Sequence, residues 1–284
     1  MFNKALTPLF FLGFISIFTA HYQPVAAVQL TLTDGNSSAI YDDNSGAGYY
    51  GFNDWQTDSQ TLLTETGLFY RVGNTGKAKT LDTLDSSSTV NGNSATVNYT
   101  GTGFTIDLDL SLNDSDSTLN QTATINNTSS STLDFELFSY FDLVTSSGST
   151  GDTVGIDSNS YTATQSGDRN IITTTVTENN TSYTERRGEV DAIDTIEDTL
   201  IGIRNDNNSQ LDNDISTITE TVNPVSFAYQ WDYSLGNNES FEVAFNSSNN
   251  AVAVPFEFSP GLGLVLSGFF GCSYYFKRKF KSPT

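Results

Sequence analysis

The side chains that could do chemistry in this chain almost all carry oxygen. The 284 residues include 33 acidic residues but a single His and a single Cys. His21 lies in an apolar N-terminal segment and Cys272 in an apolar C-terminal one, so the body between them has neither residue type. The body therefore cannot form a disulfide, a Cys nucleophile, a Ser-His-Asp triad or a zinc site with nitrogen or sulfur ligands.

Carboxylates alone could still hydrolyse glycosidic bonds, because both catalytic groups of such enzymes can be Asp or Glu. Asp107 and Asp109 fall on one side of an expected strand, about 7 Å apart by strand rise, and Asp142, Asp232 and Glu242 are further candidates. Such pairs arise by chance in so acidic a body. We therefore assign no catalytic residue and expect a protein without enzymatic activity, with a secreted glycan hydrolase as an alternative.

Calcium binding is the second chemistry that the sequence could support, because several loops are rich in hard oxygen donors. None of these loops has the EF-hand spacing, and the preference of Asp and Asn for turns explains them equally well. We expect no other cofactor. The candidate calcium ligands are Asp42, Asp43, Asp114, Asp116, Asp206, Asp212 and Asp214.

Aromatic residues and one arginine suggest a ligand surface. Tyr49, Tyr50 and Trp55 would suit carbohydrate if they were exposed. Arg71 stands inside an aromatic strand of a very acidic protein, so we expect it to have a dedicated carboxylate or stacking partner. A structural role is favoured for Arg71 over a role in ligand binding.

The charge of the body restricts its partners. Residues 28–254 hold seven basic and thirty-two acidic residues, a net charge of −25. Nucleic acid and other polyanions are therefore excluded as electrostatic partners, because no basic surface is available to attract them. Divalent cations are compatible with this charge, as is a simple role in solubility.

The elements that must position these residues are mostly strands. Residues 102–112 alternate strictly between apolar and polar, and residues 95–99 are their expected partner. Residues 225–235 alternate in the same way, and we expect them to form a hairpin with residues 241–245. The apolar stretch 133–143 should be buried on both faces.

One segment has a different period, since residues 189–202 carry apolar side chains at roughly helical spacing. Many short strands with Gly- and Asn-rich turns indicate an antiparallel β-sandwich, jelly-roll-like or immunoglobulin-like, with at most one short helix.

Both ends of the chain have the pattern of targeting segments. Residues 1–27 contain Lys4, an apolar run and a small-residue site, which predicts a signal peptide cut after Ala27; an uncleaved anchor is the alternative. Residues 258–276 carry no charge and are long enough for a membrane helix, and residues 277–284 are basic. The basic cluster predicts that this tail stays cytoplasmic and that the body is exported.

Pro255, Phe256 and Glu257, followed by the span and the basic tail, resemble the PEP-CTERM sorting signal in its cyanobacterial Pro-Phe-Glu variant. The resemblance implies that an exosortase cuts the transiently membrane-anchored protein near this motif. The mature protein would then reach the cell surface or its exopolysaccharide. Phe256 stands where the family usually has Glu, which implies a variant enzyme. A permanent anchor is the alternative.

The body itself is similar to a group of PEP-CTERM exported proteins in residues 51–55, 68–76 and 81–84. That likeness implies no catalytic residues. The expected organisation is a signal peptide (1–27), a β-sandwich domain (28–254) and a sorting signal (255–284). We expect an exported, non-enzymatic surface or matrix protein, or alternatively a carbohydrate-binding or calcium-dependent adhesive module.

Overall fold

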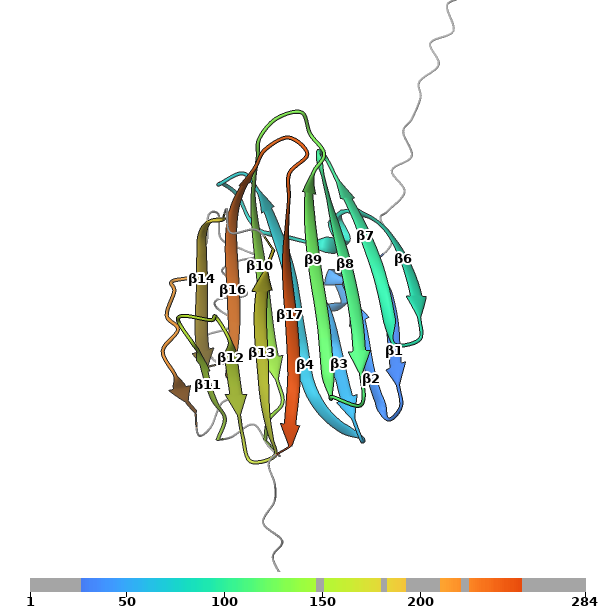
Figure 1. Cartoon of the computed structure of the whole chain (residues 1–284), viewed down its shortest axis with the longest axis vertical. Coiled ribbons are helices and arrows are strands. Elements are labelled where there is room, and N and C mark those ends of the chain that lie inside the picture. Colours follow the sequence, from blue (N-terminus) through green and yellow to red (C-terminus); the bar gives the residue numbers. More distant parts are fainter. Residues whose placement is uncertain (1–26, 147–150, 180–182, 193–209, 221–224, 252–284) are drawn as a thin grey trace, which may run out of the picture.

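The computed structural model shows two antiparallel sheets packed face to face (Figure 1). The residues that it describes are 27–146, 151–179, 183–192, 210–220 and 225–251. Within these residues no helix has the length and apolarity needed to cross a membrane. The predicted signal peptide, apart from Ala27, and the predicted span at 258–276 lie outside the described residues. The predicted β-sandwich is confirmed.

The first sheet, sheet A, has the strand order β1-β2-β3-β4-β10-β16-β14, with β5 paired to β4. Its strands are β1 (Gln29–Asp34), β2 (Ser37–Asp42), β3 (Gly51–Thr57), β4 (Gln60–Val72), β5 (Lys79–Thr80), β10 (Leu133–Leu143), β14 (Tyr183–Ala192) and β16 (Val225–Leu235). Two short 3-10 turns, η1 (Ser45–Ala47) and η2 (Leu81–Thr83), lie in its connections.

The second sheet, sheet B, has the order β15-β11-β12-β13-β17-β9-β8-β7-β6. Its strands are β6 (Asp85–Asn91), β7 (Ser94–Gly101), β8 (Phe104–Asn113), β9 (Thr118–Asn127), β11 (Thr153–Ile156), β12 (Ala163–Ser166), β13 (Asn170–Glu178), β15 (Ile218–Thr219) and β17 (Ser240–Ala251). The predicted pairing of residues 95–99 with 102–112 is confirmed as the β7–β8 hairpin.

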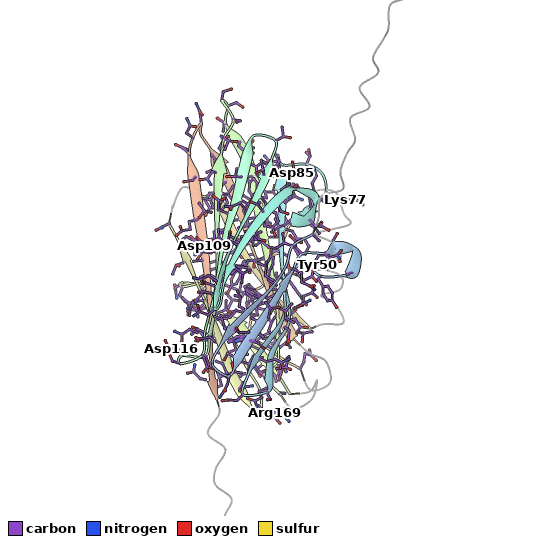
Figure 2. All side chains as sticks on the ribbon, turned by 90° about the vertical axis from the view of Figure 1, so that its right-hand side faces the viewer. Tyr50, Lys77, Asp85, Asp109, Asp116 and Arg169 are labelled. Atoms are coloured by element: carbon purple, nitrogen blue, oxygen red, sulfur yellow. The ribbon has the colours of Figure 1, made fainter. Side chains whose placement is uncertain are left out.

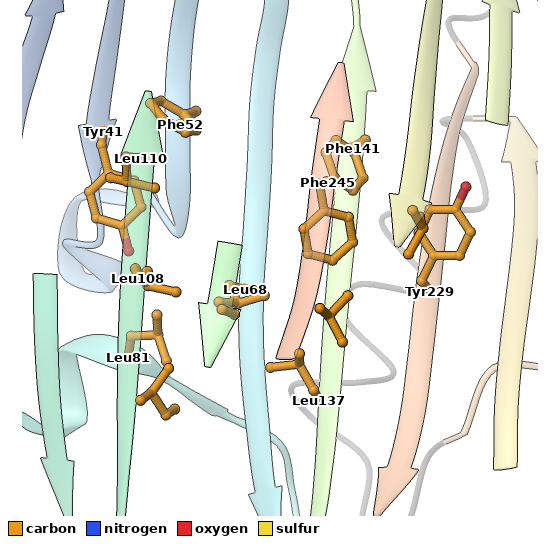
Figure 3. Close-up of a cluster of buried hydrophobic side chains, with 14 of the residues drawn as sticks. Tyr41, Phe52, Leu68, Leu81, Leu108, Leu110, Leu137, Phe141, Tyr229 and Phe245 are labelled. Atoms are coloured by element: carbon orange, nitrogen blue, oxygen red, sulfur yellow. The ribbon is translucent and has the colours of Figure 1, made fainter. Parts of the chain in front are cut away.

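The core lies between the sheets and is built from the alternating apolar residues of both. Phe141 of sheet A packs against Phe245 of sheet B, with 5.4 Å between the ring centroids (Figure 3). The hydroxyl groups of Tyr41 and Tyr99 also meet across the sheets, at 2.9 Å. Burial of each large side chain of this kind contributes about 1.5–3 kcal/mol, so the strict alternation of these strands is what holds the sheets together.

Strand β10 is buried on both faces, as the sequence predicts. Its inward side chains join the main core, whereas Phe138 and Tyr140 face outward. There they form a second cluster with Tyr50, Phe69, Ala78, Leu211 and Ala228. Connecting segments therefore cover the outer face of sheet A, which allows charged side chains to be buried on that face as well.

The predicted hairpin between residues 225–235 and 241–245 is wrong. Strand β16 pairs with β10 and β14 in sheet A, whereas β17 pairs with β13 and β9 in sheet B. The turn between them passes from one sheet to the other, and Tyr233 stacks on Phe241 across the core with 3.5 Å between ring centroids. Asn127 supports this arch by donating to the backbone oxygens of Leu235 and Gly236, at 2.9 and 3.0 Å.

The predicted helix at residues 189–202 is wrong where the structure describes it. Glu189 to Ala192 continue strand β14, and Val190 lies opposite Phe227 of β16. The side chain of Val190 is buried in the core. Pairing with a central strand thus outweighs the local helical period. Residues 193–202 lie outside the described part of the chain.

Candidate functional site

The predicted exposed aromatic surface is not present as such. Trp55 is fully buried on the inner side of β3, where Ala39 and Leu63 are its neighbours in register. Tyr50 is also buried, and its ring packs against Phe69 with 5.4 Å between centroids. Tyr49 is the one of the three that is exposed, at 40%. The expectation of exposure is therefore wrong for Trp55 and Tyr50.

Arg71 has the dedicated partners that the sequence predicts. It lies on the outer side of β4, opposite Glu136 of β10, and the two form an ion pair. Both side chains are buried, at 2% and 3% exposure. The guanidinium group also lies over the ring of Phe138, 5.3 Å from its centroid, and donates to the carbonyl of Gly76 at 3.2 Å. Carboxylate pairing and stacking thus occur together.

A second carboxylate stands beside this pair, because Asp232 of β16 is the register partner of Glu136. Burial raises the pKa of both carboxyl groups. Hydrogen bonds from Arg71 to Glu136 and from Gln230 to Asp232 oppose that rise in pKa. Two adjacent carboxyl groups could serve glycoside hydrolysis. However, Glu136 is held by Arg71 and is 3% exposed, so a substrate cannot reach it, and we assign the pair a structural role.

The chain itself covers the neighbouring part of this face. The backbone N–H of Leu211 donates to Gln230 at 2.9 Å, and Arg187 donates to the carbonyl of Leu211 at 3.0 Å. The side chain of Leu211 is buried against sheet A. The polar groups of this outer face therefore bind the protein's own backbone.

Of the other candidate carboxylates, Asp107 and Asp109 are neighbours on one strand, whereas Asp142 and Glu242 lie on separate strands. Asp107 and Asp109 share one side of β8, as predicted, and accept hydrogen bonds from Asn98 at 2.7 Å and Thr96 at 3.0 Å. Asp142 lies opposite Glu65, further along β10 than Glu136. It is therefore distant from Asp232, which lies opposite Glu136. Glu242, on β17, accepts a hydrogen bond from Asn179 at 2.8 Å.

The acids proposed as calcium ligands are engaged in local hydrogen bonds. Asp43 accepts from the backbone of Val28 and the hydroxyl group of Tyr99. The carboxylates of Asp42, Asp114, Asp116, Asp212 and Asp214 also accept hydrogen bonds from neighbouring groups. Asp206 lies outside the described residues, and within these no three acidic side chains are grouped for a metal. Calcium binding by these loops remains a prediction.

A ligand-sized pocket of about 520 Å³ lies at one end of the sandwich, where β4, β5, β6 and the β7–β8 turn meet. Its floor consists of the buried side chains of Tyr70, Leu84 and Phe104. We call it the Tyr70 pocket. Its remaining walls are formed by Val72, Lys79, Thr83, Asp85, Thr100, Gly101 and Thr102.

Local geometry explains how the Tyr70 pocket forms. The β7–β8 turn passes over Phe104, and a Cβ atom on Gly101 would collide with the Phe104 ring. Tyr70 stands opposite, with 5.4 Å between the two ring centroids, and its hydroxyl group hydrogen-bonds Thr83 of η2 at 3.0 Å. Burial raises the pKa of Tyr70, so its hydroxyl group keeps its proton. Figure 2 shows Asp85 at this end of the molecule, near Lys77.

This arrangement has the two properties that a sugar-binding site needs. The aromatic and aliphatic floor can pack against the apolar face of a sugar ring, and the hydroxyl, ammonium and carboxylate groups of the wall can bond its hydroxyl groups. In the sequence, Tyr70 stands out only as the aromatic neighbour of Arg71. Phe104 could not be distinguished from ordinary core residues, because it opens a strictly alternating strand.

The processing residues are described only in part. Ala27 is exposed and lies two residues before β1, a position open to a peptidase. Pro255, Phe256 and Glu257 lie outside the described residues.

No protein-family model matches the chain, and no curated protein sequence matches it. Among solved structures it is similar in fold to a bacterial glucoamylase complexed with acarbose, with a TM-score of 0.50 and 10% identity over 79% of this chain. The chain spans 34% of that glucoamylase.

Two further similar structures are covered over their whole length. A putative aldose 1-epimerase from Escherichia coli K12 has a TM-score of 0.46 and 11% identity over 80% of this chain. A galactose mutarotase-like protein from Lactobacillus casei has a TM-score of 0.47 and 8% identity over 78% of this chain. The likeness to the glucoamylase is one of fold alone.

Proposed function

We propose that this is an exported, non-enzymatic surface or matrix protein whose sandwich binds a glycan in the Tyr70 pocket. The observation that carries the proposal is the combination of an aromatic floor with hydroxyl and charged side chains around it. A net charge of −25 on residues 28–254 favours a neutral glycan over an anionic one. The likeness in fold to part of a glucoamylase solved with acarbose is consistent with carbohydrate as the ligand class.

Binding without hydrolysis is favoured by the acids of the pocket. Glycoside hydrolysis generally uses two carboxyl groups on either side of the bond that breaks. Asp85 is the single acidic residue among those that line the Tyr70 pocket. The Glu136 and Asp232 pair lies on the other face of sheet A, with Glu136 inaccessible. The pocket is therefore suited to holding a glycan rather than cutting it.

The purified protein should be retarded in gels that contain a neutral polysaccharide, and it should release no new reducing ends from that polymer. Lys79→Met should weaken retention about tenfold, because it removes a charged hydrogen-bond donor from the pocket wall. Lys77→Met is the matched control, since this exposed lysine lies in the same connection but does not line the pocket.

Two results would count against this function. If Lys79→Met and Lys77→Met were retained equally, the glycan would bind outside the Tyr70 pocket. Steady release of reducing ends would favour the glycan hydrolase.

We also propose the route by which the protein reaches the surface. A signal peptidase removes residues 1–27, the segment 258–276 holds the protein in the inner membrane, and an exosortase-type enzyme then cuts near Pro255-Phe256-Glu257. The mature protein passes to the cell surface or the extracellular space, where exopolysaccharide is the natural glycan partner. The sequence pattern of the two ends supports this route.

The intact mass of the extracellular protein tests the route. The expected mass corresponds to a chain that begins at Val28 and lacks the residues after about Glu257. A protein that retains its full C-terminus in the membrane fraction would instead show a permanent anchor.

A further inference from the structure

A group of buried polar residues lies at another site in the sandwich, where the chain leaves β10. Its members, Thr145, Ser146, Asp152, Gln165 and Asn170, are between 0% and 5% exposed. We call them the Asp152 cluster. Arg169 precedes Asn170, a member of the cluster. Figure 2 shows Arg169 toward the end of the molecule opposite to Asp85, so the cluster lies away from the Tyr70 pocket.

The antiparallel register brings the Asp152 cluster together. Strand β12 runs between β11 and β13, and Gly167, at the end of β12, donates its N–H to the carbonyl of Asn170 at 3.1 Å. A Cβ atom on Gly167 would lie 2.6 Å from Oδ1 of Asp152, so the glycine leaves space that the cluster occupies. The carbonyl of Thr145 accepts from the N–H groups of Arg169 and Asn170, at 3.1 and 3.0 Å.

The carboxylate at the centre of the cluster has neutral partners. Ser146 donates to Oδ1 of Asp152, and the amide nitrogen of Gln165 contacts Oδ2 at 3.3 Å. Asp152 takes part in none of the ion pairs found among the described residues, and the neighbouring Arg169 has an exposed side chain. A buried carboxylate without a cation carries a large desolvation penalty.

Three oxygen atoms of the cluster have no hydrogen-bond partner within the described structure. They are Oγ1 of Thr145, Oε1 of Gln165 and Oδ1 of Asn170. The orientation of the Gln165 amide is fixed, because its nitrogen donates to the carbonyl of Leu143 at 2.9 Å and faces Asp152. The oxygen of the Gln165 amide is therefore left as a buried acceptor without a hydrogen-bond partner. A buried acceptor that stays unpaired destabilises the folded state.

The combination points to a cation rather than to water alone. A water molecule can donate two hydrogen bonds but brings no net charge, whereas a cation satisfies neutral oxygens and neutralises the carboxylate at once. Carboxylate, amide and hydroxyl oxygens are hard ligands, the type that calcium prefers. We propose that one calcium ion binds in the Asp152 cluster, with ligands from Asp152, Gln165, Asn170 and Thr145 and with water completing its shell.

A single carboxylate places the affinity in the weak range of extracellular calcium modules, a Kd of about 0.1–1 mM. At 5 mM calcium the melting temperature of the purified protein should therefore rise by about 3–8 °C relative to the protein in chelator. The site is independent of the Tyr70 pocket, so its test needs no glycan. It also differs from the calcium loops predicted from the sequence.

Thermal unfolding of three proteins, each in 5 mM calcium chloride and in chelator, tests the proposal. The wild type should show the rise, and Asp152→Asn should lose it, because the charge is removed while the shape is kept. Asp109→Asn, which alters an exposed acid outside both the Asp152 cluster and the predicted calcium loops, is the matched control and should keep the full rise. A rise that Asp152→Asn retains, or no rise in the wild type, would overturn the proposal.

Two further measurements address a variant that fails to fold and a monovalent cation as the ligand. Asn170→Ala removes one ligand but no charge, and equilibrium dialysis with labelled calcium should show one site per chain that this variant weakens about tenfold. If Asp152→Asn does not fold, this variant decides the question. A rise that appears with sodium chloride but not with calcium would show a monovalent site and overturn calcium as the ligand.

Discussion

Arg71→Met should lower the free energy of unfolding by about 3–5 kcal/mol, because it leaves the Glu136 carboxylate buried without its cation. Both side chains of the pair are almost fully excluded from water. Urea unfolding of the two proteins measures the difference. An unchanged midpoint would contradict the structural role of Arg71.

Two companion variants sharpen that result. Arg71→Met combined with Glu136→Leu should recover most of the lost stability, because neither charge then remains buried. Glu185→Gln is the matched control on the same face, since it breaks the half-exposed pair with Arg187 but leaves the hydrogen bond from Arg187 to Leu211, and such pairs contribute about 0–1 kcal/mol. A double variant as unstable as Arg71→Met would indicate that lost packing, not an unpaired charge, is the cause.

Asp142→Asn should stabilise the protein at pH 8 by up to about 4 kcal/mol and have little effect at pH 4. Burial is the main reason that the pKa of Asp142 rises to about 7; a hydrogen bond from Thr64 opposes the rise, and the charge of Asp152 adds to it. The unfolded pKa is 3.8, so between pH 3.8 and 7 the folded state keeps a proton that the unfolded state has lost. This group's contribution to stability is therefore lost as the pH rises through that window.

Denaturant midpoints of the wild type and Asp142→Asn at pH 4, 6 and 8 measure this effect. Asp109→Asn, which removes an equal charge from the exposed side of β8, is the matched control for general charge repulsion. If the two variants differ from the wild type by the same amount at every pH, the raised pKa of Asp142 is wrong.

Much of the fold can be predicted from the sequence, because a strand with one buried face shows an alternation of apolar and polar residues. Strands β8, β10 and β16 were predicted almost to their ends. In β8 and β16 apolar residues occupy every second position, whereas β10 carries apolar residues on both faces. The hairpin predicted between β16 and β17 is wrong, because two strands that alternate toward the same core look the same in sequence whether they share a sheet or face each other. Ring stacking between Tyr233 and Phe241 holds them across the core instead.

The site was less accessible to sequence reasoning. Because Arg71 stands alone among aromatic residues, the sequence predicts a carboxylate or stacking partner for it. The structure shows both, in Glu136 and Phe138. The Tyr70 pocket combines strand β4, the η2 connection and the β7–β8 turn, so no local pattern reveals it. Gln165 and Asn170 resemble the many surface polar residues of the body, and only their burial distinguishes them.

Isothermal titration with neutral oligosaccharides, cut from a polysaccharide that retains the protein, tests glycan binding in the Tyr70 pocket. The wild type should bind one oligosaccharide per chain. Thr102→Trp should abolish the heat, because a large ring in the pocket wall would fill the space above Tyr70 and Phe104. Thr31→Trp, at an exposed position of the edge strand β1, is the control and should bind as the wild type does. Equal binding by all three proteins would contradict the assignment of the glycan site to this pocket.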